Sequence, residues 1–121
     1  MTRPLFRLLL LAIVGFTRIA LADLDHDVKK AEGQLYGAIH RAVSDLVKKG
    51  ERDAQTIESL ASERTRTEQI KYLAAYTARE VQHGRKRSDA EMTAKETIAE
   101  MFDNVIGGML SNVPEVSTPR K

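Results

Sequence analysis

The segment Glu80-Val-Gln-His83 has the spacing of a metal-ligand pair, because residues three apart lie on one face of a helix. In carboxylate-bridged helical bundles, a Glu-x-x-His motif supplies two ligands to a metal centre. Such centres need a second copy of the motif and two further glutamates, and the sequence has one copy. His83 also precedes Gly84, a position where histidine commonly contacts the last carbonyls of a helix. We therefore expect helix capping here and no metal.

The acidic cluster Asp23-Leu-Asp-His-Asp27 is a second candidate, because its alternating carboxylates are spaced like the first ligands of a calcium loop. The cluster lacks the central glycine of such a loop, and Gln34 stands at the twelfth position, which needs Glu. His26 lies one position too late in the expected mature chain for an amino-terminal copper or nickel chelate. Carboxylates of this kind suit the first turn of a helix. We expect no metal and no cofactor.

The sequence offers little for nucleophilic catalysis. It contains no cysteine and no Gly-x-Ser-x-Gly elbow. His40 and Ser44 share a helix face, but nothing marks an orienting acid or oxyanion donors beside them. Glycine loops that bind phosphate are also missing, and 17 acidic residues are expected on the surfaces of amphipathic helices. We predict that the protein is not an enzyme, and no small-molecule substrate is evident.

The first 22 residues have the pattern of an export signal. Cationic residues up to Arg7 precede the apolar run Leu8–Phe16, and Ala20-Leu-Ala22 presents small residues where a signal peptidase reads them. A retained membrane anchor is the alternative, but Thr17-Arg18 interrupts the run well short of the roughly 20 apolar residues that a spanning helix needs. We expect cleavage before Asp23 and export to the periplasm or the extracellular space.

Removal of this leader changes the charge of the 121-residue chain. The full sequence has a net charge of +2, but Arg3, Arg7 and Arg18 leave with the leader, so that 16 bases remain against 17 acids. The expected mature chain therefore carries a net charge of −1, which argues against nucleic acid as a partner. Without cysteine, the chain forms no disulfide.

Composition and periodicity predict an all-α fold. Good helix formers dominate residues 23–112, and no stretch alternates apolar and polar residues in the manner of a strand. We expect an antiparallel bundle of three long helices in 23–112, or four helices if the chain breaks near 62–67. A disordered tail is expected over 113–121, after Gly107-Gly108 weakens the last helix and Pro114 stops it.

The first helix of the bundle is predicted to start after the acidic cluster and to end at Lys48-Lys-Gly50. Gly33 and Gly37 each weaken it by about 1 kcal/mol relative to Ala, or they admit close packing of another helix. Its buried stripe is predicted to comprise Val28, Ala31, Leu35, Ile39, Ala42, Val43, Leu46 and Val47.

The middle region, 51–83, has two apolar patches that are out of phase. The first comprises Ile57, Leu60 and Ala61, and the second comprises Ile70, Leu73, Ala74, Thr77, Ala78 and Val81. Residues 62–69 between them contain no apolar side chain, and Thr65 followed by Glu68 fits a capping box. We predict a break there, although one helix with a solvated middle is the alternative.

The last helix is predicted to open with the capping box Ser88-Asp-Ala-Glu91, directly after the turn at Gly84. It carries the densest apolar face in the sequence and should be the main element of the core. This face comprises Ile98, Met101, Phe102, Val105, Ile106, Met109 and Leu110.

The core looks thin for a free-standing monomer, because Leu, Ile, Val and Phe total 19 of the 99 residues after the leader. We therefore expect self-association or a protein partner to cover apolar surface. Tyrosines are favoured at interfaces, and a basic turn suits an acidic partner or phosphate. The candidate interaction residues are Tyr72, Tyr76, Arg85, Lys86, Arg87, Phe102, Ile106 and Met109.

These observations favour an exported, non-enzymatic helical protein that acts through protein–protein contacts, as an envelope accessory, an inhibitor, or a component of a secretion or surface assembly. The alternative is a membrane-surface protein whose last helix lays its apolar face on a bilayer beside Arg85-Lys-Arg87. An enzyme or a metal carrier is the third class.

Overall fold

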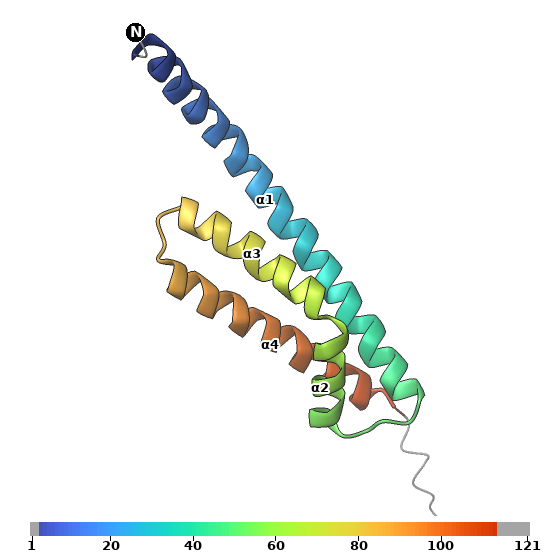
Figure 1. The fold of residues 1–121 in the computed structure, drawn as a ribbon. Coiled ribbons are helices and arrows are strands. Elements are labelled where there is room, and N and C mark those ends of the chain that lie inside the picture. Colours follow the sequence, from blue (N-terminus) through green and yellow to red (C-terminus); the bar gives the residue numbers. More distant parts are fainter. Residues whose placement is uncertain (1–2, 114–121) are drawn as a thin grey trace, which may run out of the picture.

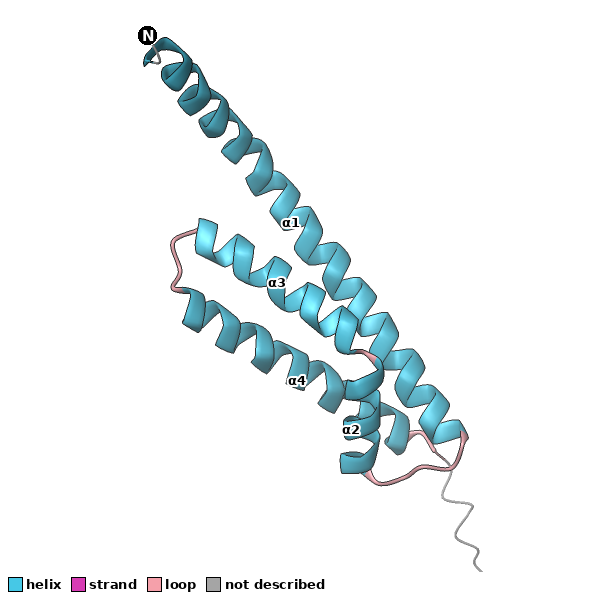
Figure 2. Cartoon of the chain, viewed as in Figure 1, coloured by secondary structure: helices cyan, strands magenta, loops and turns pink. Residues whose placement is uncertain are grey.

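A computed structural model describes the backbone of residues 3–113 and the side chains of residues 22–113. Four helices make up this part of the chain (Figure 1). They are α1 (Arg3–Lys48), α2 (Ala54–Arg64), α3 (Arg66–Gln82) and α4 (Arg87–Ser111). The described residues contain no strand, so the predicted all-α fold is confirmed (Figure 2). Of the predicted disordered tail, residues 114–121 lie outside the described residues.

The three long helices lie side by side, with α3 antiparallel to both α1 and α4 (Figure 1). The short helix α2 lies at the end of the bundle where α1 finishes, and it contacts the other three helices. The N-terminal part of α1 projects beyond the ends of α3 and α4. The fold is the predicted antiparallel bundle, in its four-helix form.

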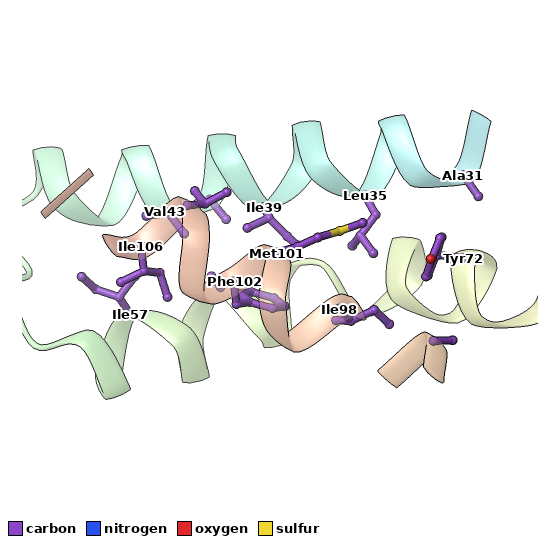
Figure 3. Packing of buried hydrophobic residues seen from close by; sticks show 14 of the residues in the cluster. Ala31, Leu35, Ile39, Val43, Ile57, Tyr72, Ile98, Met101, Phe102 and Ile106 are labelled. Carbon is purple, nitrogen blue, oxygen red and sulfur yellow. The ribbon is translucent and has the colours of Figure 1, made fainter. Parts of the chain in front are cut away.

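Helix α1 buries the stripe that its periodicity predicts. Leu35, Ile39 and Val43 are fully buried and face the side chains of α4 across the core (Figure 3). The other predicted positions are buried as well, apart from Val47, which is half-buried. The glycine that ends the helix is also confirmed, because Gly50 has a φ of 104°, in the left-handed region that favours glycine.

The predicted start of this helix at the acidic cluster is wrong for the full-length chain. Helix α1 runs without interruption through residues 23–27, so the carboxylates there lie in mid-helix and cap no free amides. The residues before them are rich in Leu and Ala, which propagate a helix that is already formed.

The predicted break in the middle region is confirmed at Thr65. Helix α2 begins after Asp53, whose carboxylate accepts a hydrogen bond from the Thr56 amide at 2.9 Å, and it ends at Arg64. The capping box of Thr65 does not form, because the buried Thr65 hydroxyl donates back to the Ala61 carbonyl at 2.8 Å. Gln69 supplies the other contact at the break, since its side-chain amide donates to the Ser62 carbonyl at 2.9 Å.

Helix α3 buries a different face from the one predicted. Ile70 is 59% exposed and Ala74 is also exposed, whereas Tyr72 is only 3% exposed. Of the second predicted patch, only Thr77 is fully buried. The face that carries Tyr72, Leu73 and Tyr76 packs against the core instead, because an aromatic ring contributes more buried area than the alanines of the predicted face. In the first patch, Ile57 and Ala61 are buried while Leu60 is 39% exposed.

Helix α4 supplies the other side of the core, as predicted. Ile98, Phe102 and Ile106 are buried on one stripe, facing α1 and α2 (Figure 3). The predicted capping box at Ser88 is wrong, because the helix already begins at Arg87 and its capping residue, Lys86, makes no side-chain cap. The positive φ of 93° at Gly84 turns the chain in time for this earlier start.

Candidate interaction surface

The side chain of Arg85 holds the turn between α3 and α4 together. Its guanidinium donates to the Glu80 carboxylate at 3.1 Å and to the Tyr76 hydroxyl at 3.2 Å, both on α3. It also donates to the Thr93 hydroxyl of α4 at 2.9 Å. A guanidinium presents several donors in a fixed plane, so one residue bridges two helices. Within the chain, Arg85 thus has a structural role.

Glu80 is the anionic centre of this cluster. The hydrogen bond from Arg85 lowers the pKa of Glu80, and Arg79 adds to the effect through an ion pair of 3.1 Å. Arg79 also lies over the ring of Tyr76, with its guanidinium carbon 5.1 Å from the ring centroid, and approaches Asp25 of α1 at 3.7 Å. In the Glu-x-x-His segment, the Glu80 carboxylate therefore pairs with Arg79 and Arg85. His83 caps α3 through its backbone amide.

The remainder of the basic turn is exposed. Both Lys86 and Arg87 are exposed to solvent. The predicted basic segment is therefore divided, with Arg85 bonded to the bundle and its two neighbours facing solvent.

The rings of the two candidate tyrosines, Tyr72 and Tyr76, contact each other at a tilt of 36°, with ring centroids 5.9 Å apart. Tyr72 is buried in the core, and burial raises the pKa of its hydroxyl. Tyr76 is half-buried and packs against the core cluster. In the isolated chain both rings thus contribute to the contact between helices.

The candidates on α4 also face inward. Phe102 is 2% exposed and Ile106 is 4% exposed, whereas Met109 is half-buried at the edge of the core. Whether any of these residues also contacts a partner stays a prediction.

An open groove of about 500 Å³ runs along the outside of α1 and α3. Its apolar lining consists of small side chains and one leucine, namely Leu24, Ala31, Ala74, Ala75 and Ala78. Charged and polar residues border it, namely Asp27, Lys30, Gln34 and Lys71. We call this feature the alanine groove. A smaller groove beside it shares Gln34 and Lys71 and reaches Gly37 and Arg41.

Three large apolar side chains are markedly exposed on the long helices. Met92 on α4 is 62% exposed, Ile70 on α3 is 59% exposed, and Tyr36 on α1 is 49% exposed. Tyr36 lines a further open groove, between α1 and α4, together with Gly33 and Met101. Isolated exposed apolar residues are ordinary, but apolar residues beside open grooves are typical of contact surfaces.

Sequence reasoning missed the alanine groove as a site. Ala74 and Ala78 were expected in the core, because they recur at helical spacing with Ile70. These residues are exposed because α3 is rotated so that Tyr72 and Tyr76 face the core. The spacing of apolar residues in the sequence is compatible with either rotation.

Comparison with known proteins finds no matching family model, no curated relative and no similar solved structure. In the described part of the chain, no helix contains a segment of sufficient length and apolarity to span a bilayer. No group of three or more potential metal-ligating side chains occurs among the residues whose side chains are described.

Proposed function

We propose that this chain is an exported, non-enzymatic helical protein that acts through protein–protein contacts. The observation that carries the proposal is the alanine groove, an open and largely apolar surface with charged borders on a well-packed bundle. A groove between two helices with small apolar residues at its base suits an incoming helix, whose side chains fill the space that the alanines leave.

The most distinctive polar cluster is engaged within the chain and is not needed to explain a partner contact. Arg85, Glu80 and Tyr76 satisfy one another at the α3–α4 turn, which is a structural use of charged groups. The alternative, contact with a membrane surface through the apolar face of α4, is less well supported, because Ile98, Phe102 and Val105 of that face pack inside the bundle. It would require α4 to leave the core.

Site-specific photocrosslinking in the native host tests the proposal. A benzophenone amino acid replaces Ala74 in the groove, and the matched control replaces Glu58, an exposed residue of α2. We expect a defined protein adduct from the Ala74 position that the Glu58 position does not give. Equal labelling at both positions, or lipid adducts alone, would overturn the proposal.

Export is tested in the same cells by locating the protein in the envelope or medium fraction and sequencing its N-terminus. We expect a chain that begins at Asp23. Retention in the cytoplasm with Met1 in place would contradict the exported part of the proposal.

A further inference from the structure

We infer that the alanine groove of one molecule receives helix α4 of a second copy of this chain, so that the protein assembles head to tail. This inference rests on the proposed function and names the partner. It follows from two surfaces of the same molecule that match in shape and charge.

The first surface is a ridge on the outward side of α4, formed by Met92, Glu96, Ala99 and Asp103. These residues follow one another at intervals of four, three and four, so they form one stripe along the helix, and all four are exposed. Glu100 lies next to the stripe and is exposed too, while Lys95 borders its other side. We call this stripe the acidic ridge.

The carboxylates on and beside the ridge have cations nearby, Lys95 on the same helix and Lys29 in the groove that Glu100 lines, but they are not paired with them. No ion pair in the described part of the chain involves Glu96, Glu100 or Asp103. Like charges four residues apart, such as Glu96 and Glu100, destabilise a helix. A partner that brings cations to this stripe would remove that repulsion.

The groove supplies such cations. Two lysines, Lys30 and Lys71, stand on opposite walls of the alanine groove against a single carboxylate, Asp27. The neighbouring smaller groove is lined by Arg41 of α1 and by Glu68 of α3, so the excess of cations lies in the alanine groove itself. An acidic helix that enters the groove thus meets a lysine on each side.

The shapes match as well. Alanines line the groove, so a helix can approach closely, and Ala99 at the centre of the ridge allows the same on its side. Met92 is the most exposed of the large apolar residues, and a flexible thioether side chain fills an irregular apolar space well. From Leu24 to Gln34 the groove extends along three turns of α1, roughly 15 Å, and the ridge from Met92 to Asp103 is about as long.

The contact cannot close within one molecule or pair identical surfaces. The residues that line the groove belong to α1 and α3, whereas the ridge belongs to α4, so each copy has one free groove and one free ridge. Such a heterologous contact forms rings or open chains. Because the contact is narrow, we expect association in the range of tens to hundreds of micromolar, weakened by salt.

This inference is tested by sedimentation velocity. The protein is expressed from its full 121-residue sequence in a host that exports it, and the released protein is measured. We expect species larger than a dimer that grow with concentration and shrink at high salt. A ridge variant (Glu96→Lys with Asp103→Lys) and a groove variant (Lys30→Glu with Lys71→Glu) should each raise the dissociation constant of the assembly at least tenfold. Arg66→Glu, an exposed change on α3 outside the groove, is the control and should assemble like the wild type.

The decisive measurement mixes variants of opposite kinds. A ridge variant keeps its groove with a lysine on each wall, and a groove variant keeps its acidic ridge. The two altered surfaces are also opposite in charge, so the mixture should regain an association that neither variant shows alone. A chain that stays monomeric up to about 500 μM, in the weak-contact range expected above, would overturn the inference. So would variants that assemble like the wild type, or a mixture that regains no association.

These outcomes separate the inference from the proposed function. A monomeric protein that still gives a specific adduct from the Ala74 position with another protein would retain the proposed function and lose the self-assembly. Circular dichroism on each variant checks the fold, which should be unchanged because every altered side chain is exposed.

Discussion

At the scale of single residues, Arg85 decides how the α3–α4 turn is held. Its guanidinium reaches Tyr76 and Glu80 on one helix and Thr93 on the other, so that a residue from an apparently solvated basic turn becomes a bridge. Its neighbours Lys86 and Arg87 stay exposed. Position in the sequence alone did not distinguish these three bases.

The Arg85–Glu80 contact makes stability depend on pH. The pKa of Glu80 lies below its usual value of 4.5, chiefly because Arg85 donates to the carboxylate. A group with a lowered folded-state pKa contributes stability above its unfolded-state pKa, and this stability is lost as the pH falls through the folded-state pKa. We expect the thermal midpoint to drop below about pH 4.3, and Glu80→Gln to reduce this dependence while lowering the midpoint at pH 7.

Melting curves by circular dichroism between pH 7 and pH 3 measure the effect. Glu58→Gln, which changes an exposed carboxylate on α2, serves as the control and should leave the curves unchanged. An unaltered pH profile in Glu80→Gln would mean that the contact with Arg85 adds nothing to stability.

Two glycines give a matched pair of predictions. A Cβ atom at Gly33 meets no atom within 4 Å, and this residue lies inside α1, so Gly33→Ala should stabilise the fold by up to about 1 kcal/mol. Gly84 has a φ of 93°, so Gly84→Ala should destabilise it by about 1 to 2 kcal/mol. Urea unfolding at equal m-values measures both changes. Destabilisation by Gly33→Ala would show that a neighbour closely approaches this glycine in solution.

At the scale of helices, α4 depends on one large side chain. Phe102 is the only aromatic residue that α4 brings to the core, and it is nearly fully buried. Phe102→Ala should therefore cost about 3 to 5 kcal/mol, a large share of the 5 to 15 kcal/mol that stabilises a typical domain. Thermal denaturation should show a fold that is marginal or already melted.

Met92→Ala is the matched control on the same helix, because Met92 is exposed in the monomer and should change stability by less than about 0.5 kcal/mol. If Phe102→Ala kept the wild-type midpoint and instead abolished assembly, Phe102 would act at an intermolecular contact, and α4 would not be the centre of the core.

The orientation of α3 shows how a helix selects its buried face. Its sequence offers two competing stripes, one through Ile70 and Ala74 and one through Tyr72 and Tyr76. The tyrosine stripe faces the core, and the aliphatic stripe forms part of the alanine groove. The same rotation that buries Tyr72 thus creates the proposed docking surface.

At the scale of the whole molecule, the proposed export depends on cleavage of the first 22 residues. We predict that Ala22→Asp blocks processing, because a signal peptidase admits only small side chains beside its cleavage site. The expected product on a denaturing gel is a precursor about 22 residues longer than the processed chain. The control is Gln34→Asp, an exposed change outside the leader that should be processed normally. A buried position such as Ala38 would not serve, because an aspartate there would disturb the fold. Normal processing of Ala22→Asp would show that cleavage occurs elsewhere.

The sequence by itself determined the fold class and the stripe that α1 buries, and it favoured the break near 62–67 that gives the bundle four helices. Helices form through hydrogen bonds between residues four apart, and glycines with positive φ such as Gly50 and Gly84 end them, so these features can be read locally. The break was indicated locally too, because residues 62–69 contain no apolar side chain, whereas the burial of Thr65 at the break follows from packing.

Only the tertiary structure decided which face of α3 is buried, which base closes the α3–α4 turn, and where an apolar groove remains open. The buried face of α3 and the groove depend on residues distant in sequence that come within contact range, as Arg79 does with Asp25. The contacts of Arg85 are with residues five to nine positions away, but they need α3 and α4 to lie side by side. Ile70 and Tyr72 are both apolar enough for a core, and the choice between them rests on which ring or side chain fills the space between α1 and α4. Periodicity measures the spacing along one helix, whereas packing depends on the volumes that three helices present to one another.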